Sequence, residues 1–206
     1  MFNKIGIFFG SFNPMHEGHI YAIKKALNTT IDKLYLVISP QCEKVPFIDR
    51  RKMAELTIRF YNLENKIDFF DENECSPYIY DVLKTLSSRF TNTDIVVFVG
   101  LDAFLTIDTW KEPKYILENH TIYIIPRNCT DATESIFNKK EELLKTITSN
   151  IKTISYSNPL KTFNMDGNQI RNLIDLGQST ENMIVSEVRK YIDDKSLYKI
   201  SHKTLF

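Results

Sequence analysis

Short apolar runs alternate with amphipathic segments along the 206 residues of the chain. The apolar runs have the length of strands and the amphipathic segments have the spacing of helices, a pattern typical of a parallel sheet wrapped by helices. The predicted strands cover residues 4–9, 33–38, 67–70, 94–99, 121–125 and 151–155. The predicted helices cover residues 17–27, 50–62, 78–90, 133–148, 167–176 and 180–193. Together they predict an α/β fold with a doubly wound parallel sheet.

The loops at the carboxyl ends of the strands are the expected ligand site, because a doubly wound sheet opens its crevice there. The first strand runs directly into GSFNPMHEGH, residues 10–19. Gly10 lets the backbone turn sharply as it leaves the strand, and Pro14 ends any extended pairing. Residues 39–49 lack clear periodicity and follow a strand, so we expect them to lie over the ligand. Residues 127–132, also without periodicity, are expected to form solvated surface.

The composition is that of one globular domain. The length fits a single domain over residues 1–206, with a C-terminal helical part from about residue 167. The 26 basic and 26 acidic residues balance, so we expect neither nucleic acid nor a membrane as a partner. Three scattered cysteines without CxxC spacing argue against disulfides and structural zinc: Cys42, Cys75 and Cys129. We expect a soluble cytoplasmic protein, with nuclear entry and homo-oligomer formation left open.

The segment GSFNPMHEGH has the chemistry of a nucleotide-phosphate site. His16 and His19 are three residues apart at the start of a predicted helix, so both imidazoles share one helical face. Free N–H groups at a helix N-terminus attract anions, and Gly18 removes a side chain where a ligand must come close. The alternative is a plain strand-loop-helix turn whose histidines are surface caps.

This segment resembles the HxGH signature of the nucleotidyltransferase superfamily. Its Gly-Ser-Phe-Asn-Pro lead-in resembles the nicotinate/nicotinamide mononucleotide adenylyltransferases in particular. The resemblance extends over nearly the whole chain and implies a Rossmann-like nucleotidyltransferase fold that closes with C-terminal helices. It also implies a set of ATP-binding residues: Gly10, Ser11, Phe12, His16, Gly18, His19, Gly100, Asp102, Gly167, Asn168 and Arg171.

The segment GLDAFLTIDTW, residues 100–110, resembles the family's glycine-x-aspartate segment with its downstream tryptophan. It follows a predicted strand, so Gly100 permits close approach of a nucleotide and Asp102 can accept hydrogen bonds from ribose hydroxyls. The alternative for Asp102 is a helix N-cap. In the family an aromatic at Trp110 stacks on the pyridine ring, and the alternative is a core tryptophan.

Two further segments are assigned to the mononucleotide by resemblance. Ser76-Pro77-Tyr78-Ile79 resembles a stretch that offers backbone groups to the pyridine substituent, although Pro77 also suits a plain helix start. Lys44 matches the phosphate-contacting lysine of a loop that usually also contains a histidine, which is missing here, and the alternative is a solvated loop lysine. The implied mononucleotide-binding residues are Ser11, Phe12, Asn13, Lys44, Tyr78, Ile79, Leu105 and Trp110.

The C-terminal box MDGNQIR, residues 165–171, departs from the family's Ile-Ser-x-Thr-x-Ile-Arg motif because both hydroxyls are absent. An ionised Asp166 cannot donate to a phosphate, so we expect it to cap a helix. The N–H groups of Gly167 and Asn168 are then expected to meet the phosphate. Arg171, one turn into that helix, can reach phosphoryl oxygens, with a surface position as the alternative.

The function that we expect is transfer of the adenylyl group of ATP to nicotinate mononucleotide, with nicotinamide mononucleotide left open as a second substrate. The candidate catalytic residues are His16, His19, Lys44 and Arg171. No general base is required, since the attacking phosphate is already ionised. We expect no protein metal site and a Mg²⁺ ion held by ATP oxygens and water. The alternatives are another nucleotidyltransferase of the superfamily, such as a phosphopantetheine adenylyltransferase or a cytidylyltransferase, a non-catalytic nucleotide sensor, and a structural protein on a relic of the fold.

Overall fold

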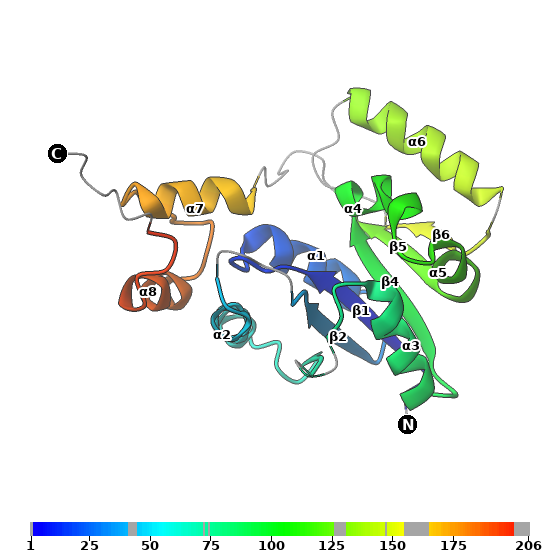
Figure 1. Ribbon diagram of the computed structural model, residues 1–206, viewed down its shortest axis with the longest axis horizontal. Helices are drawn as coiled ribbons and strands as arrows, with labels where there is room; N and C mark the ends of the chain where they lie inside the picture. The colour runs from blue at the N-terminus through cyan, green and yellow to red at the C-terminus, as the bar shows by residue number, and fades with distance from the viewer. Residues whose placement is uncertain are drawn as a thin grey trace.

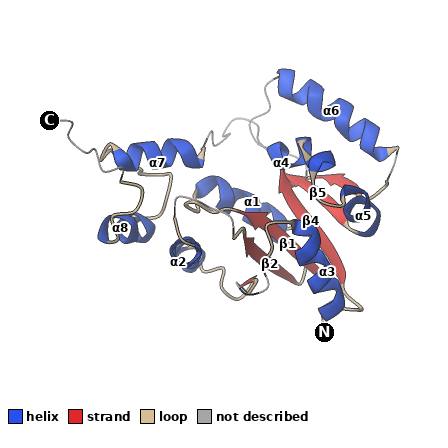
Figure 2. Ribbon diagram, viewed as in Figure 1, coloured by secondary structure: helices blue, strands red, loops and turns tan. Residues whose placement is uncertain are grey.

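Six parallel strands form one sheet in the order β3-β2-β1-β4-β5-β6 (Figures 1 and 2). The structure is a computed structural model that describes residues 2–40, 45–71, 73, 75–125, 131–146, 148–154 and 165–199. The strands are β1 (Lys4–Gly10), β2 (Lys33–Ile38), β3 (Ile67–Phe69), β4 (Asp94–Gly100), β5 (Thr121–Ile125) and β6 (Ile151–Thr153). The predicted α/β fold with a doubly wound, Rossmann-like parallel sheet is confirmed.

The helices follow the predicted pattern, apart from two short helices and some helix ends. They are α1 (Glu17–Leu27), α2 (Phe47–Phe60), α3 (Ile79–Arg89), α4 (Leu101–Leu105), α5 (Pro113–Asn119), α6 (Asp131–Lys145), α7 (Gly167–Asp175) and α8 (Ser186–Asp194), with a 3-10 turn at Ile107–Thr109. The short helices α4 and α5 were not among the predicted helices, and α2 begins before its predicted start. Helix α8 begins later than predicted, because Asn182 has a left-handed backbone with φ 60° that interrupts a helix. None of the described helices has the length and hydropathy of a membrane span.

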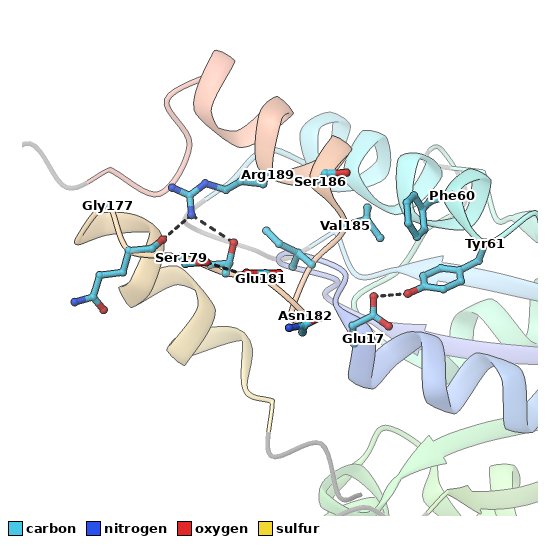
Figure 3. A pocket seen from close by; sticks show the side chains of 13 residues that line it. Glu17, Phe60, Tyr61, Gly177, Ser179, Glu181, Asn182, Val185, Ser186 and Arg189 are labelled. Carbon is cyan, nitrogen blue, oxygen red and sulfur yellow. Dashed lines mark hydrogen bonds between the residues drawn. The ribbon is translucent and has the colours of Figure 1, made fainter.

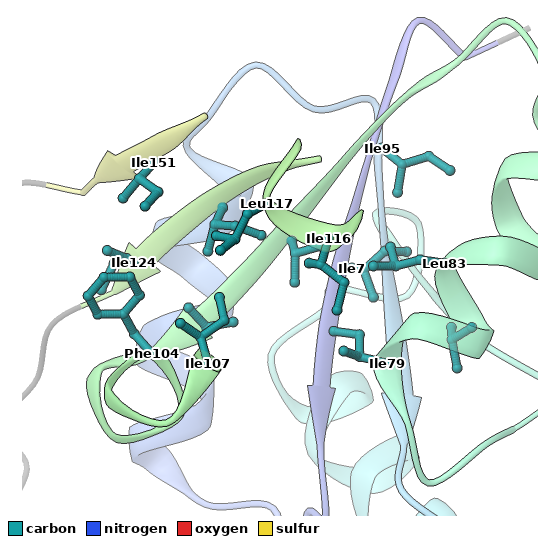
Figure 4. Close-up of a cluster of buried hydrophobic side chains, with 14 of the residues drawn as sticks. Ile7, Ile79, Leu83, Ile95, Phe104, Ile107, Ile116, Leu117, Ile124 and Ile151 are labelled. Atoms are coloured by element: carbon teal, nitrogen blue, oxygen red, sulfur yellow. The ribbon is translucent and has the colours of Figure 1, made fainter. Parts of the chain in front are cut away.

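Each face of the sheet has its own hydrophobic core, because side chains alternate between the faces along every strand. Helices α3 to α6 cover one face, where Ile7, Leu83 and Phe104 belong to one buried cluster (Figure 4). Helices α1 and α2 cover the other face, where Phe8 and Ile23 belong to a second cluster. Burial on both faces explains why the central strands are apolar throughout.

The chain reverses its direction of winding between β1 and β4. Strands β2 and β3 lie on one side of β1, and β4, β5 and β6 lie on the other. Strands β1 and β4 pair in parallel with Phe8 opposite Phe98, so the loops that follow them leave from the same edge. A crevice opens at such a switch point, because the two crossovers run to opposite faces of the sheet.

The C-terminal helices α7 and α8 pack against α2 rather than against the sheet (Figure 1). Met53 of α2 lies in a third buried cluster with Ile170 and Ile174 of α7 and Val188 of α8. The hydroxyl of Tyr191 on α8 donates to Asp49 Oδ1 at 2.7 Å. This third core fixes α7 beside the carboxyl edge of the sheet.

A buried histidine lies at the opposite, amino edge. His120 ends α5, is 5% exposed, and has its Nδ1 3.2 Å from the carbonyl oxygen of Ile95. Its Nε2 has no hydrogen-bond partner among the described residues. Burial lowers the pKa of His120, although the contact with Ile95 and the charge of Asp94 oppose that effect.

His120 therefore makes stability depend on pH. The unfolded histidine takes up a proton below about pH 6.5, whereas the folded one resists it, so the free energy of unfolding falls as pH drops below that value. In His120→Asn, which keeps a donor for Ile95, we expect urea unfolding between pH 5 and 6.5 to show a flatter dependence on pH than in the parent chain. Measurements at pH 8, where the histidine is neutral in both states, give each variant its reference. An unchanged slope would contradict this assignment.

Candidate active site

Two histidines cap each other's backbone in the first turn of α1. His16 is the N-cap residue, and its Nδ1 accepts from the N–H of Gly18 at 3.2 Å. His19 Nδ1 accepts from the N–H of His16 at 3.2 Å, which completes a capping box. The ring centroids are 3.8 Å apart, and His16 is 3% exposed. The predicted placement of both imidazoles together at a helix start is confirmed. The alternative, in which the histidines are surface caps, is right about the capping, but His16 is buried.

The capping bonds assign the tautomer of both rings. An imidazole whose Nδ1 accepts a hydrogen bond carries its proton on Nε2, an assignment that follows from the hydrogen-bond network. His16 and His19 therefore each have an Nε2–H donor while their Nδ1 atoms hold the helix start. Two adjacent N–H donors at a helix N-terminus can bind the acceptor oxygens of a phosphate chain.

The loop between β1 and α1 turns most of its side chains inward. Phe12 is fully buried, has a left-handed φ of 45°, and packs between Phe8 and His19 with ring centroids 5.8 and 5.1 Å away. Asn13 is 7% exposed, whereas Ser11 is exposed. Of these three predicted ligand residues, Phe12 can offer only its backbone, and its ring supports the position of His19.

The C-terminal box reaches this loop through Arg171. Its Nη1 donates to the carbonyl oxygen of Asn13 at 2.6 Å, and its Nη2 donates to Asn168 Oδ1. Asp166 caps α7 as predicted, but its Oδ1 accepts from the N–H of Asn168 at 3.0 Å. The expectation that the N–H of Asn168 meets a phosphate is therefore wrong, because the cap uses that donor.

The carboxylate of Asp166 lies near Arg171 and His16. The hydrogen bond from the N–H of Asn168 holds the pKa of Asp166 below its usual range, and the nearby Arg171 and His16 lower it further. Asp166 is thus ionised at neutral pH and cannot donate to a phosphate. This electrostatic contact also shows that the α7 N-terminus and the histidine pair share one neighbourhood.

Trp110 lies in a pocket of about 380 Å³, which Phe9 at the end of β1 also lines. The predicted residues Tyr78 and Ile79 line the same pocket, so segments about thirty residues apart in the chain meet as the resemblance implied. Leu105, also predicted, does not line it and packs instead against the core. The remaining lining residues are Phe9, Pro77, Ala103, Thr106, Thr109 and Lys111. Trp110 is only partly buried, so a ligand ring can reach it.

Gly100 and Asp102 lie where β4 passes into α4. Gly100 is the N-cap residue of α4, so the alternative in which Asp102 caps this helix is wrong. Asp102 is an exposed residue in the first turn, at the carboxyl edge of β4. Lys44 and the three residues before it, 41–43, lie outside the described residues.

A wider groove of about 880 Å³ lies between the start of α1, the end of α2 and the segment that joins α7 to α8 (Figure 3). Glu17, Tyr61 and Arg189 contribute to its walls, but none of the predicted site residues does. Tyr61 donates to Glu17 at 2.5 Å, and Arg189 donates to the Gln178 carbonyl at 2.8 Å. Because these groups are engaged with each other, we place the chemistry at the carboxyl edge of the sheet despite the smaller pocket there.

Arg50 is the residue of this region that sequence reasoning missed. Its side chain is fully buried, and it donates to the carbonyl oxygens of Val45 at 3.1 Å and of Ser11 and Ser39 at 2.8 Å. One guanidinium thus joins the loop after β1 to both described ends of the loop after β2. The only sequence signal is an arginine in the first turn of a helix, which is ordinary on a protein surface.

Comparison with known proteins identifies the family. The sequence model of the cytidylyltransferase-like family matches residues 7–190. A protein of Flavobacterium johnsoniae named probable nicotinate-nucleotide adenylyltransferase is 30% identical over 203 residues, which cover 95% of this chain and 99% of that protein. The chain belongs to the nicotinate-nucleotide adenylyltransferase family. The resemblance seen in the sequence is thereby confirmed.

Solved structures of nicotinic acid mononucleotide adenylyltransferase from Plasmodium falciparum share the fold. One, complexed with APC, aligns with a TM-score of 0.79 at 21% identity and covers 95% of this chain and 97% of its own. Another, complexed with NaAD, aligns with a TM-score of 0.77 over the same shares. In this member of the nicotinate-nucleotide adenylyltransferase family, the histidine pair, the α7 N-terminus and the Trp110 pocket surround the carboxyl ends of β1 and β4.

We expect Arg50→Lys to damage both stability and activity. A lysine has no donor at the position of Arg50 Nε, which donates to Val45, and each buried carbonyl oxygen left unpaired costs about 1–3 kcal/mol. The neighbouring Arg51→Lys is the matched control, because Arg51 pairs with Glu55 on the surface and such pairs contribute about 0–1 kcal/mol. Urea unfolding and steady-state kinetics check both variants. Equal behaviour of the two variants would show that Arg50 is dispensable.

A second prediction concerns the C-terminal box. The double change Asp166→Ser and Asn168→Thr restores the family's hydroxyls, and serine still caps the helix. Arg171 keeps its bond to the Asn13 carbonyl, so we expect activity within about tenfold of the parent chain, a span of about 1.4 kcal/mol. Arg171→Ala is the contrasting variant and should be severely impaired. An increase in activity of several orders of magnitude in the double variant would show that the native box has lost catalytic function.

Proposed function

We propose that this chain transfers the adenylyl group of ATP to nicotinate mononucleotide and releases pyrophosphate. The observation that carries the proposal is the pair of histidine N–H donors at the α1 N-terminus, beside Arg171 and next to an aromatic pocket. Phosphate oxygens can accept from the histidine N–H donors and pair with Arg171, and a flat ring can enter the aromatic pocket. The names of the relative from Flavobacterium and of the Plasmodium structures support the same substrates.

The proposed reaction is an in-line displacement at the α-phosphorus of ATP. A phosphate oxygen of the mononucleotide forms a bond to that phosphorus, and the bond to the oxygen that bridges to the β-phosphate breaks. The electron pair of the broken bond leaves with pyrophosphate. The attacking oxygen is already ionised near neutral pH, so the protein has to position two anions and stabilise the departing charge.

His16 and His19 are proposed to hold the phosphate chain through Nε2–H. Their Nδ1 atoms are fixed by the helix start, so the donors are preorganised and need not reorient during the reaction. Arg171 adds a fixed positive charge at the same edge, and Lys44 is proposed as a further cation. We propose that Asp102 accepts from ribose hydroxyls, because it is an exposed carboxylate beside Gly100.

ATP is proposed to enter as its magnesium complex. Among the described residues there is no group of three or more His, Cys, Asp or Glu side chains that could hold a metal ion. The ion is proposed to be held by phosphate oxygens and water, which Mg²⁺ commonly keeps as ligands. The ion belongs to the substrate in this description.

The pyridine ring is proposed to occupy the pocket of Trp110 and Tyr78. A base that stacks on an aromatic side chain gains about 1–3 kcal/mol in nucleic-acid sites, which sets the scale for a pyridine ring.

Release of pyrophosphate on mixing the protein with ATP and nicotinate mononucleotide tests the function directly. Phosphopantetheine in place of nicotinate mononucleotide, or CTP in place of ATP, tests for the other nucleotidyltransferase activities. Binding of nucleotides without turnover would identify a sensor.

His19→Ala should lower turnover far more than it weakens substrate binding. The lost donor faces charge that grows in the transition state, and removal of one such donor typically costs about 10²–10³ in kcat. Because His19 also accepts from the N–H of His16, thermal unfolding of the variant has to accompany the kinetics. A rise in KM at unchanged kcat in the folded protein would assign His19 to uniform binding instead.

A further inference from the structure

The pocket of Trp110 contains one charged residue in otherwise uncharged surroundings. Apart from Lys111, its described lining consists of aliphatic, aromatic and hydroxyl side chains. Apolar and aromatic walls accept a flat ring, whereas an ammonium beside them suits an anionic substituent on that ring. The pocket thus has the chemistry of a site for an aromatic carboxylate.

The ammonium of Lys111 lies beside Tyr78, an aromatic residue of the pocket wall. It donates to Asp81 Oδ1 at 2.7 Å and lies 5.1 Å from the ring centroid of Tyr78 and 5.5 Å from that of Tyr80. Contact with two aromatic faces and a carboxylate restricts the long side chain. A carboxylate ligand then meets a charge that is already in position.

Asp81 ties this charge to the wall of the pocket. The hydroxyl of Ser76 donates to Asp81 Oδ2 at 2.7 Å and accepts from the N–H of Tyr78 at 3.2 Å. The bond to Asp81 raises the pKa of Lys111, so the lysine is cationic throughout the neutral range. Asp81 does not itself line the pocket and accepts one of the three ammonium N–H groups, which leaves Lys111 donors for a carboxylate ligand.

We propose that Lys111 selects the acid mononucleotide over its amide by pairing its ammonium with the carboxylate on the pyridine ring. This rests on the proposed function, which puts the pyridine ring in the pocket. The amide has the same shape but no charge, so its contact with Lys111 is weaker. Lys111 is thus a specificity-determining residue that touches the substrate.

The test compares kcat/KM for the two mononucleotides. In Lys111→Met, which keeps the length of the side chain without the charge, the ratio of acid to amide should fall about tenfold, equivalent to about 1.4 kcal/mol. The expected change is modest because the Lys111 side chain is 41% exposed and its charge is partly screened. Lys111→Arg keeps the charge and should retain most of the preference.

Lys114→Met is the matched control. Lys114 is three residues further along, 80% exposed, and 3.8 Å from Glu118, and it does not line the pocket. Its variant should keep the parent ratio of acid to amide. An unchanged ratio in Lys111→Met, or an equal loss for both mononucleotides, would overturn the proposal.

A binding measurement separates this proposal from the proposed function. Trp110 is the only tryptophan of the 206 residues and lines the pocket, so its fluorescence reports ring binding without turnover. Titration of the parent chain and of Lys111→Met with each mononucleotide should give the same tenfold loss of acid preference. A parent chain that forms no dinucleotide but binds the acid more tightly than the amide through Lys111 contradicts the proposed function alone. Equal affinities for acid and amide in the parent chain contradict the inference.

Discussion

The parallel pairing of β1 with β4 is the constraint on which the site depends. It requires Gly6, because a Cβ at that position would lie 2.6 Å from the Phe98 ring and 2.9 Å from Ile31. With no side chain there, Phe98 lies across β1 and stacks on Tyr123 at a centroid distance of 5.1 Å. The two strands then end at the same edge with their loops adjacent. The histidine pair, Arg171 and the Trp110 pocket lie around that edge.

The charged groups of the site are concentrated locally and do not depend on the net charge of the protein. The chain has as many acidic as basic residues, so its overall field attracts no anion. Cationic and N–H groups are instead concentrated locally: His16 and His19 start α1, and Arg171 lies across from them on α7. Asp166 is a carboxylate within this cluster, and its negative charge is satisfied by Asn168 and Arg171 rather than by a phosphate. Local arrangement therefore replaces net charge as the source of anion binding.

Most of the fold could be predicted from the sequence, because long apolar strands and amphipathic helices have clear periods. Helix α1 matches its prediction, and β1 and β4 differ by one residue at the end. The short α5 was missed because seven residues contain too little periodicity. Segment 180–185 was assigned to a helix because nothing in the sequence marks Asn182 as left-handed.

The candidate site could be predicted where its residues are close together in the sequence. It could not be predicted where contacts join residues that are far apart in the sequence. The HxGH spacing predicts the capping pair, and resemblance brings Tyr78 to Trp110. Arg50 was missed because its partners are carbonyl oxygens up to 39 residues away, which no side-chain pattern records. Phe12 was assigned to the ligand by resemblance, and its burial against Phe8 and His19 could not be predicted because these rings meet only in the folded chain.

Asn13 receives two contacts that differ in how they survive mutation. Arg171 donates to its backbone carbonyl at 2.6 Å, whereas Tyr198 donates to its side-chain Oδ1 at 2.5 Å. Every amino acid has the carbonyl, so substitutions at position 13 that preserve the backbone leave the link to α7 in place. The link to Tyr198 instead disappears with the amide side chain. Substitution at this position can therefore remove the hydrogen bond from Tyr198 to the loop while the arginine remains bound.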